Sequence, residues 1–238
     1  MEEMRVRSLL DDLATSGARF HGWAPEVEVS WGLNEPALEL LVELVSKGQR
    51  TLETGVGFST VVFGALGAEH TVVSPASFEH DRVREWCEQR GVDLGAVTFV
   101  ASPSQEALPR LDPTPLDIVL IDGDHAFPTP FIDFWYAGGR LVPGGLLVVD
   151  DTHLRACSVL ADFLRAEHGR WRVHRELATT TVFERLDGPM VPPEGWALQP
   201  WGATPLPVGP PLSVGRRVRN AVRLRTRVRA ALAKARAR

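Results

Sequence analysis

The chain has 238 residues, of which 44% are hydrophobic and 24% are charged, and its formal net charge is −4 at pH 7. This length suits one α/β domain with a full core and short appendages. No apolar run approaches the roughly 20 residues that a membrane-spanning helix needs, and the acidic beginning MEEMRVRSLLDDL does not resemble a signal peptide. These features predict a cytoplasmic protein.

The charge is divided unevenly along the chain. Ten of the 26 Lys and Arg residues, and none of the 30 Asp and Glu residues, lie from Arg216 onward. The remaining 16 basic and 30 acidic residues give residues 1–215 a net charge of −14. The body of the chain is therefore acidic and its tail is basic.

Residues 1–33 are predicted to form an N-terminal helix and a lid-like segment ahead of the main domain. The helix is expected over residues 1–20, where four apolar residues recur at helical spacing: Met4, Leu9, Leu10 and Leu13. The loop that follows contains Trp23 and Trp31. These two side chains fit a substrate lid or core packing equally well.

The main domain, residues 34–186, is expected to begin with a helix that runs from an N-cap at Asn34 to Gly48. A strand near residues 50–53 then leads into the glycine turn ETGVGFST, residues 53–60, and an apolar helix. Such a turn brings backbone N–H groups and the positive end of a helix close to a ligand. The acid at the strand end suits a cationic or hydroxyl-rich ligand better than a pyrophosphate, and a plain tight turn is the alternative interpretation.

Two further strands are predicted at residues 70–74 and 97–100, and a helix over residues 78–90 separates them. The first of these strands ends in Ser74, and the second runs into the sequence SPSQ, residues 102–105. A short helix to Leu111 is expected next. Cys87 and Cys157 lie in predicted helices without the spacing of metal ligands, so packing roles for two reduced thiols are expected.

Residues 116–152 contain two short apolar runs that each end in aspartate. Residues 118–121 precede Asp122, and residues 146–149 precede Asp150 and Asp151. Apolar runs without alternation are typical of parallel strands buried on both faces. Because the ligand crevice of such a sheet lies beyond the carboxyl ends of its strands, the three carboxylates are expected at one ligand or metal site.

Between these runs, residues 128–140 are predicted to form a crossover helix, and Pro143-Gly144-Gly145 a turn before the second strand. Trp135 and Tyr136 are expected to pack this helix rather than to stack on a substrate. The acids have structural alternatives as well. Asp151 or Thr152 can cap the next helix, and Asp122-Gly123 can be a strand-end turn.

A helix over residues 153–168 and a closing pair of strands at residues 171–177 and 179–185 complete the domain. Strands that alternate with helices and then end in a hairpin predict an α/β fold. We expect a doubly wound, Rossmann-like sheet of seven strands, mostly parallel, with an antiparallel terminal hairpin.

The last residues are predicted to form two further segments. Residues 187–213 contain eight prolines and are expected to be a semi-rigid linker. Residues 214–238 are expected to form a basic amphipathic helix with a Val- and Ala-rich stripe. This helix can contact an anionic membrane surface at the inner membrane face or another polyanion, and high salt should then release it. A solvated or self-docked helix is the alternative.

The order of these motifs resembles the class I S-adenosylmethionine-dependent methyltransferases. The motifs are Glu-x-Gly-x-Gly, then Ser-Gln before a short helix, then LIDGDH and PGGLLVVDD. More narrowly, the chain resembles the small metal-dependent O-methyltransferases of the catechol and antibiotic-sugar types. The resemblance covers about residues 30–186, and the paired strand ends are its specific part.

The resemblance implies a site for S-adenosylmethionine and a site for Mg²⁺ or another divalent cation. The cofactor site would consist of Glu53, Gly55, Gly57 and Ser59 at the methionine part, Ser104 and Gln105 at the adenine, and Asp122. The metal ligands would be Asp122, Asp150 and Asp151. His125 would be the catalytic base, as the histidine of the sugar type is.

The catalytic base has alternatives, and the expected ribose-binding acid is absent. A solvated loop histidine is the alternative interpretation of His125, and His153 is a second candidate base. The family normally ends its second strand in an acid that binds both ribose hydroxyls, whereas this chain has Ser74 there. Glu79 is the nearest acid, and its position does not match.

The sequence therefore predicts metal-assisted O-methylation of a hydroxylated small molecule or glycosyl group, with S-adenosylmethionine as the donor. Such a reaction is an in-line displacement that needs an aligned and electron-rich acceptor oxygen. Two alternatives remain: a non-catalytic binding protein of methyltransferase ancestry, and a dinucleotide-dependent oxidoreductase. A homo-oligomer is also left open.

Overall fold

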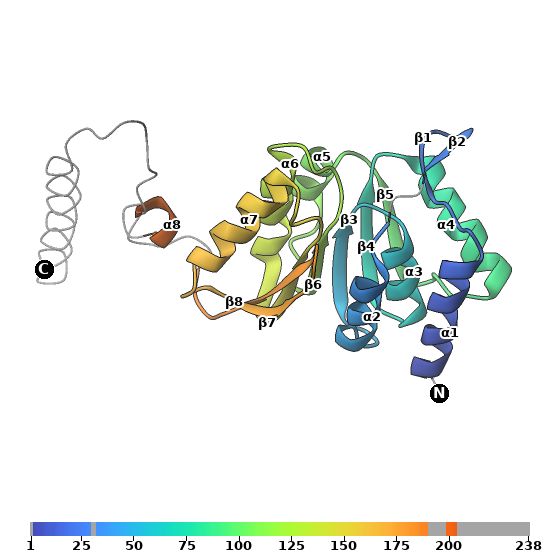
Figure 1. Ribbon diagram of the computed structural model, residues 1–238, viewed down its shortest axis with the longest axis horizontal. Coiled ribbons are helices and arrows are strands. Elements are labelled where there is room, and N and C mark those ends of the chain that lie inside the picture. The colour runs from blue at the N-terminus through green and yellow to red at the C-terminus, as the bar shows by residue number, and fades with distance from the viewer. Residues whose placement is uncertain (1, 30–31, 190–198, 204–238) are drawn as a thin grey trace, which may run out of the picture. The chain divides into compact units, whose positions relative to one another are not determined.

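The computed structural model describes residues 2–29, 32–189 and 199–203. The central sheet consists of β3 (Arg50–Thr54), β4 (Glu69–Ser74), β5 (Val97–Ala101), β6 (Leu116–Ile121), β7 (Leu141–Val149), β8 (Trp171–Glu176) and β9 (Thr181–Arg185). The order across this seven-stranded sheet is β5-β4-β3-β6-β7-β9-β8 (Figure 1). All pairs are parallel except β7–β9 and β8–β9, which are antiparallel. The predicted fold class is confirmed.

Helices precede and connect these strands. The α-helices of the main body are α1 (Glu2–Thr15), α2 (Glu35–Leu44), α3 (Phe58–Ala65), α4 (Ser77–Arg90), α5 (Ser104–Ala107), α6 (Thr129–Tyr136) and α7 (Arg155–Ala166). Two short 3-10 helices, η1 (Leu108–Arg110) and η2 (Gly138–Arg140), follow α5 and α6. The predicted N-cap at Asn34 is confirmed, because its side chain accepts a hydrogen bond from the N–H of Ala37 at 3.1 Å.

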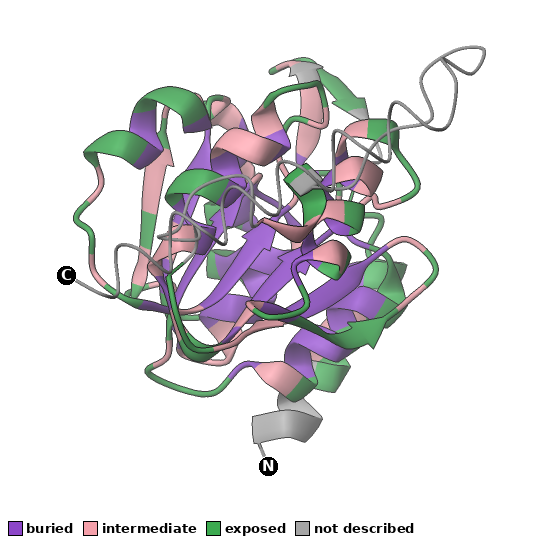
Figure 2. Cartoon of the chain, turned by 90° about the vertical axis from the view of Figure 1, so that its left-hand side faces the viewer, coloured by how far each residue is buried: buried purple, intermediate pink, exposed green. Residues whose placement is uncertain are grey.

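The helices cover both faces of the sheet. Helices α1, α2, α3 and α4 contact one another in one group, and α5, α6 and α7 contact one another in a second group. Figure 2 shows buried strands in the interior and helices whose outer surfaces are exposed. This two-sided cover explains why the central strands read as unbroken apolar runs.

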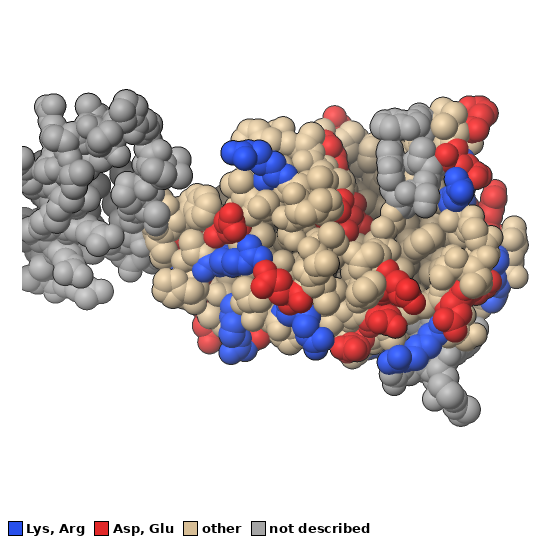
Figure 3. All heavy atoms as spheres, viewed as in Figure 1, with Lys and Arg blue, Asp and Glu red and all other residues tan. Residues whose placement is uncertain are grey.

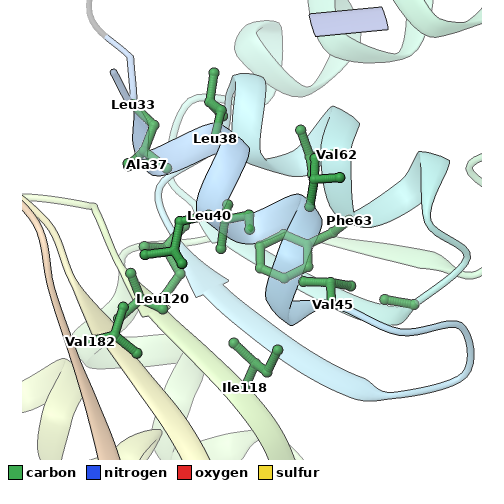
Figure 4. Packing of buried hydrophobic residues seen from close by; sticks show 14 residues of the cluster. Leu33, Ala37, Leu38, Leu40, Val45, Val62, Phe63, Ile118, Leu120 and Val182 are labelled. Atoms are coloured by element: carbon green, nitrogen blue, oxygen red, sulfur yellow. The ribbon is translucent and has the colours of Figure 1, made fainter. Parts of the chain in front are cut away.

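One hydrophobic cluster joins α2 and α3 to the middle of the sheet. Leu41 of α2 and Phe63 of α3 are 1% and 0% exposed, and they pack in the same cluster as Ile118 and Leu120 of β6 and Val182 of β9 (Figure 4). Truncation of a buried phenylalanine to alanine typically costs about 3–5 kcal/mol. This cluster holds the helix that follows the glycine turn firmly against the sheet.

The structure differs from the sequence expectations at the N-terminal segment. The first helix ends at Thr15 rather than near residue 20, and the predicted loop contains a two-stranded hairpin, β1 (His21–Ala24) and β2 (Val27–Val29). The side chains of Trp23 and Trp31 lie outside the described residues. Whether they form a lid therefore stays a prediction.

The predicted turn at Pro143-Gly144-Gly145 is wrong, because β7 already begins at Leu141. The three residues instead form an irregularity within the strand. The β6 partner of Leu141 is Leu116, whereas that of Leu146 is Ile118, so extra residues are accommodated between the two pairs. A proline without a backbone N–H and a glycine with φ of 82° fit such a bulge.

Only part of the chain after residue 186 is described. The chain forms two compact units, Met1–Gly188 and Pro189–Arg238, and the second contains the short helix α8 (Pro200–Ala203). The predicted basic helix at residues 214–238 and most of the predicted linker lie outside the described residues. Among the helices that the structure describes, none has the length and apolar character needed to span a bilayer.

Candidate functional site

Three neighbouring strands end side by side at the carboxyl edge of the sheet. Thr54 of β3 pairs with Ile121 of β6, and Ile121 pairs with Val149 of β7. The ladder continues past the strand ends, since Asp122 donates its N–H to the carbonyl of Thr54 and Asp150 to that of Ile121, both at 3.0 Å. The residues that follow each strand therefore stand in one row.

The glycine turn lies at one end of this row. Gly55 has φ of 99°, and a Cβ on it would be 2.3 Å from the carbonyl oxygen of Asp122. Only glycine fits there, because both the backbone conformation and the close approach exclude a side chain. Gly57 donates its N–H to the hydroxyl of Thr60 at 2.9 Å, in the first turn of α3. The turn thus places backbone N–H groups and the start of a helix at the sheet edge.

Glu53 is buried beneath this turn, with 1% of its surface exposed. Its Oε1 accepts a hydrogen bond from Thr60 and lies 3.2 Å from Nε2 of His70. His70 is held in turn by Thr51, whose Oγ1 is 2.7 Å from Nδ1. Oε2 of Glu53 has no hydrogen-bond partner among the described residues. A buried carboxylate oxygen without a donor is costly, so this atom is suited to a ligand ammonium or hydroxyl group.

Asp122, His125 and Asp151 form a group of possible metal ligands beside the turn. One ligand atom from each residue lies within 4.8 Å of the others, and all three residues are partly buried. Two carboxylates and one imidazole match the donor set of a divalent cation such as Mg²⁺ or Mn²⁺, although an imidazole nitrogen is a softer ligand than Mg²⁺ prefers. The side chains present therefore fit a divalent cation.

The backbone of Asp151 is unusual, because this residue has φ of 50°. A non-glycine residue in this left-handed region is uncommon, and aspartate is among those that tolerate it best. The following N–H groups fix the conformation: Leu154 donates to the carbonyl of Asp151 at 2.7 Å, and Thr152 donates to that of Thr179 at 2.8 Å. The turn after β7 is therefore held in place, and it aims the Asp151 carboxylate at His125.

Both ring nitrogens of His125 are engaged. Nε2 lies 2.9 Å from Oδ2 of Asp151, and Nδ1 lies 3.6 Å from Sγ of Cys157, which is fully buried. His153, the second candidate base, is 53% exposed at its side chain, and its Nδ1 lies 3.6 Å from the other oxygen of Asp151. His125 is thus held between Asp151 and Cys157, whereas His153 retains access to solvent.

Asp150 is placed differently from the prediction that made it a metal ligand. It is 4% exposed, and its Oδ1 accepts a hydrogen bond from the hydroxyl of Thr180 in the turn before β9. Burial raises the pKa of Asp150, and the bond from Thr180 opposes this rise. His125, rather than Asp150, completes the group with Asp122 and Asp151.

Asp122 stands at the centre of several carboxylates. Its tight surroundings desolvate it and raise its pKa well above the usual value, and the nearby charges of Asp150, Glu53 and Asp151 raise it further. A site that makes a carboxylate hard to ionise favours the binding of a cation, which removes this repulsion. Both the raised pKa of Asp122 and the arrangement of the possible ligand atoms therefore favour cation binding.

The predicted adenine contacts lie at the start of α5. Ser104 is its first residue and is buried, whereas Gln105 is exposed. Asp133 of α6, which was not identified from the sequence, is fully buried. Neither of its carboxyl oxygens has a partner of hydrogen-bonding geometry among the described residues. Burial raises the pKa of Asp133, and the neighbouring hydroxyls of Ser104 and Thr54 oppose the rise. Ser59, in α3, is buried as well.

Three aromatic side chains of α6 and of the segment before it are exposed. Trp135 and Tyr136 of α6 are 53% and 40% exposed, so the expectation that they pack the helix is wrong. Phe127, two residues after His125, is 78% exposed and was not identified from the sequence. Its position two residues after the LIDGDH motif was the available signal.

Residues 52–152 match a family model described as a methyltransferase domain. No curated protein sequence matches the chain. The family match covers less than half of the chain and, together with the fold, supports a methyltransferase domain.

Solved structures of methyltransferases share this fold at low sequence identity. A "putative O-methyltransferase" from Klebsiella pneumoniae is 18% identical with a TM-score of 0.57, over 67% of this chain and 84% of that one. An rRNA methylase from Streptococcus thermophilus is 12% identical with a TM-score of 0.51, over 66% and 100% of the two chains. A 16S rRNA methyltransferase from T. thermophilus, in complex with AdoMet and guanosine, is 20% identical with a TM-score of 0.50, over 66% and 45%.

Proposed function

We propose that this chain, which its domain match and fold support as an S-adenosylmethionine-dependent methyltransferase, transfers the methyl group to a hydroxyl oxygen of a small acceptor with the help of a divalent cation. The observation that carries the proposal is the convergence of Asp122, His125 and Asp151 beside the glycine turn. In this reaction the methyl–sulfur bond breaks, a methyl–oxygen bond forms and the acceptor hydroxyl loses its proton.

The glycine turn and Glu53 would hold the donor. The N–H groups at the start of α3 suit the carboxylate of the methionine part, and the unpartnered Oε2 of Glu53 suits its ammonium group. Thr60 and His70 keep the Glu53 carboxylate in position. With its donor fixed in this way, an in-line displacement needs mainly the alignment of the acceptor.

Asp122, His125 and Asp151 would hold the cation. When bound, a divalent cation lowers the pKa of a coordinated hydroxyl and orients it. Because a ring nitrogen of His125 lies within 4.8 Å of a carboxylate oxygen of both Asp122 and Asp151, we assign His125 to the ligand set rather than to the proton transfer for which the sequence predicted it. His153, beside Asp151 and exposed, is then the residue that accepts the proton.

The surroundings of the group favour a small acceptor with an apolar or ring face. Phe127 and Leu154, 78% and 38% exposed, lie close in sequence to His125 and to Asp151 on the two loops that carry these ligands. Exposed apolar side chains beside a polar centre commonly contact the non-reacting part of a substrate. A sugar ring or another compact hydroxylated ring fits this description.

An RNA acceptor is a weaker proposal, although two of the structural neighbours are rRNA methyltransferases. Proteins that bind RNA neutralise its phosphates with clustered Lys and Arg residues. Residues 1–215 instead carry a net charge of −14. Figure 3 shows acidic and basic side chains interspersed over one face of the described body. This charge distribution supports an acceptor that is not a polyanion.

We propose a separate role for the basic tail, residues 214–238. Its ten Lys and Arg residues and the acidic body suit a protein of the cytoplasm whose tail rests on an anionic membrane surface at the inner face. Sedimentation of the full chain with anionic vesicles at low and high salt tests this role. Vesicle binding that persists at about 1 M salt, where screening is strong, would contradict it.

Calorimetric titration with S-adenosylmethionine tests the main proposal. Binding is expected without metal, and methyl transfer to a panel of hydroxylated sugars and catechols is expected only with Mg²⁺ or Mn²⁺ present and not with EDTA. Binding with metal-independent transfer would remove the cation from the mechanism. No transfer under any condition would favour a non-catalytic binding protein, and no binding at all would exclude the methyltransferase activity.

A further inference from the structure

The hairpin of β1 and β2 is fixed to α4 next to the glycine turn. Arg82 of α4 donates hydrogen bonds to the carbonyl oxygens of Phe20 at 3.1 Å, His21 at 2.9 Å and Pro25 at 2.7 Å. Figure 1 shows the hairpin beside the same end of α4, above the α3–α4 side of the sheet. Three hydrogen bonds from one guanidinium hold this short hairpin in a defined position.

A second anchor comes from Glu79, in the first turn of α4. Its Oε1 accepts a hydrogen bond from the N–H of Gly22 at 3.1 Å and lies 3.6 Å from Nδ1 of His21. Glu79 is 8% exposed. Its second carboxyl oxygen takes part in no hydrogen bond or ion pair within the described ranges 2–29, 32–189 and 199–203. A nearly buried carboxylate therefore keeps one oxygen for another donor.

His21 connects this carboxylate to the glycine turn. Its Nε2 lies 3.1 Å from the position that a Cβ on Gly57 would occupy, and its Nδ1 faces Glu79. The imidazole is thus wedged between the turn and the carboxylate. The residues on this side of the turn are therefore His21 and, beyond its imidazole, Glu79.

The neighbouring strand, β4, lacks an acid that could bind ribose hydroxyls. β4 ends in the buried Ser74 and carries no acid at its carboxyl end. In doubly wound nucleotide-binding sheets, an acid about 20 residues after the glycine turn accepts hydrogen bonds from ribose hydroxyls. Glu79 follows Gly57 by 22 positions, one helical turn beyond the strand end.

We propose that Glu79, positioned by His21 and the hairpin, binds the ribose hydroxyls of the cofactor in place of an acid at the end of β4. This inference rests on the proposed function, because it concerns the same cofactor site. The open oxygen of Glu79 accepts from the vicinal hydroxyls, and Gly22 and His21 hold its other oxygen. The N-terminal hairpin is then part of the cofactor site rather than a lid over the acceptor.

The inference is tested by calorimetric titration with S-adenosylhomocysteine and with its 2′-deoxy and 3′-deoxy analogues. The full chain is compared with Glu79→Gln, which keeps a carbonyl oxygen for the N–H of Gly22 but removes the charge. Glu79→Gln is expected to weaken the binding of S-adenosylhomocysteine by about tenfold or more, since hydrogen bonds to a charged acceptor are lost. Each deoxy analogue has already lost one of the two hydroxyls, so the loss on Glu79→Gln should be smaller for the analogues than for S-adenosylhomocysteine.

Asp81→Asn is the matched control, since it removes an exposed carboxylate of the same helix that pairs with Arg84. It should leave the affinity for all three ligands unchanged. If Glu79→Gln weakens all three equally, or none of them, Glu79 only anchors the hairpin and the inference is overturned. Should Glu79→Gln fail to fold, His21→Asn is measured in the same way and must show the same selective loss. If the unmodified chain does not bind S-adenosylhomocysteine, the proposed function itself fails.

Discussion

Nε2 of His125 lies 2.9 Å from Oδ2 of Asp151, and Asp151 reaches this position through a left-handed backbone with φ of 50°. Such a conformation costs roughly 1–3 kcal/mol for a residue other than glycine. The hydrogen bond from the N–H of Leu154 to the carbonyl of Asp151 helps to hold it. Strain of this kind at the end of a buried strand places two ligand atoms from different loops side by side.

Replacement of Asp151 by Asn tests whether the group binds a cation. Asparagine also tolerates the left-handed conformation, so the fold should be retained while the charge is lost. We expect the affinity for Mn²⁺ to fall by about tenfold or more and cofactor affinity to stay within about twofold. Calorimetric metal titration checks this, with the exposed Asp162→Asn of α7 as control. Unchanged metal affinity in Asp151→Asn would exclude this ligand role.

Substitutions of His125 and His153 should affect different properties, metal affinity for the first and turnover for the second. His125→Gln is expected to lose metal affinity by about tenfold or more, because the side chain belongs to the ligand group. His153→Gln should keep the metal affinity and lower kcat by about 100-fold or more. Metal titration and initial rates distinguish the two. The reverse assignment would restore His125 as the base.

Within the glycine turn, Gly55 should be the position where substitution by alanine destabilises the protein most. In Gly55→Ala, the added Cβ meets the carbonyl oxygen of Asp122 at 2.3 Å, and φ is 99°. Gly48→Ala is the matched control, since Gly48 has φ of 78° and open space around its Cβ. We expect a loss of about 1 kcal/mol in the free energy of unfolding for the control and a further roughly 1–3 kcal/mol for Gly55→Ala from the overlap. Chemical denaturation measures both values, and equal losses would contradict the close approach.

The central strands and the glycine turn could be predicted because their signals are local. Buried apolar runs that end in acids, and glycines placed directly after a strand, have few alternative structures. The sequence could not predict that the candidate ligand group contains His125 and not Asp150, because the position of the Asp150 side chain depends on Thr180. That hydroxyl lies 30 residues further along the chain, and it donates its hydrogen bond to Asp150 from the turn that β9 fixes by pairing with β7.

The N-terminal hairpin was missed for a similar reason. Strands of four and three residues have little stability of their own, and the contacts that stabilise this pair come from Arg82 and Glu79, nearly 60 residues away. The orientation of α6, in contrast, could have been predicted from the sequence. Its buried positions are Pro130, Asp133 and Phe134, and the buried C-cap residue Ala137 continues the helical spacing, whereas Trp135 and Tyr136 lie off that face. Helical periodicity places the acid inside and the two aromatic rings outside.

The buried acid on α6 gives the chain a pH dependence of stability. Burial raises the pKa of Asp133 above its usual 3.8, and neither carboxyl oxygen has a partner of good geometry among the described residues. The folded state therefore binds this proton more tightly than the unfolded state. Its contribution to stability is fully present below the unfolded pKa and is lost as pH rises through the folded pKa.

Asp133→Asn should remove this loss, since the amide stays neutral at every pH. We expect the variant to gain thermal stability over the unmodified chain as pH rises from 4 toward 8, by about 1.4 kcal/mol for each unit of the pKa shift. Thermal unfolding at several pH values in EDTA measures the difference. The exposed Asp81→Asn of α4 is the control and should show no such trend. A gain that is the same at pH 4 and pH 8 would mean that Asp133 ionises normally in the folded protein.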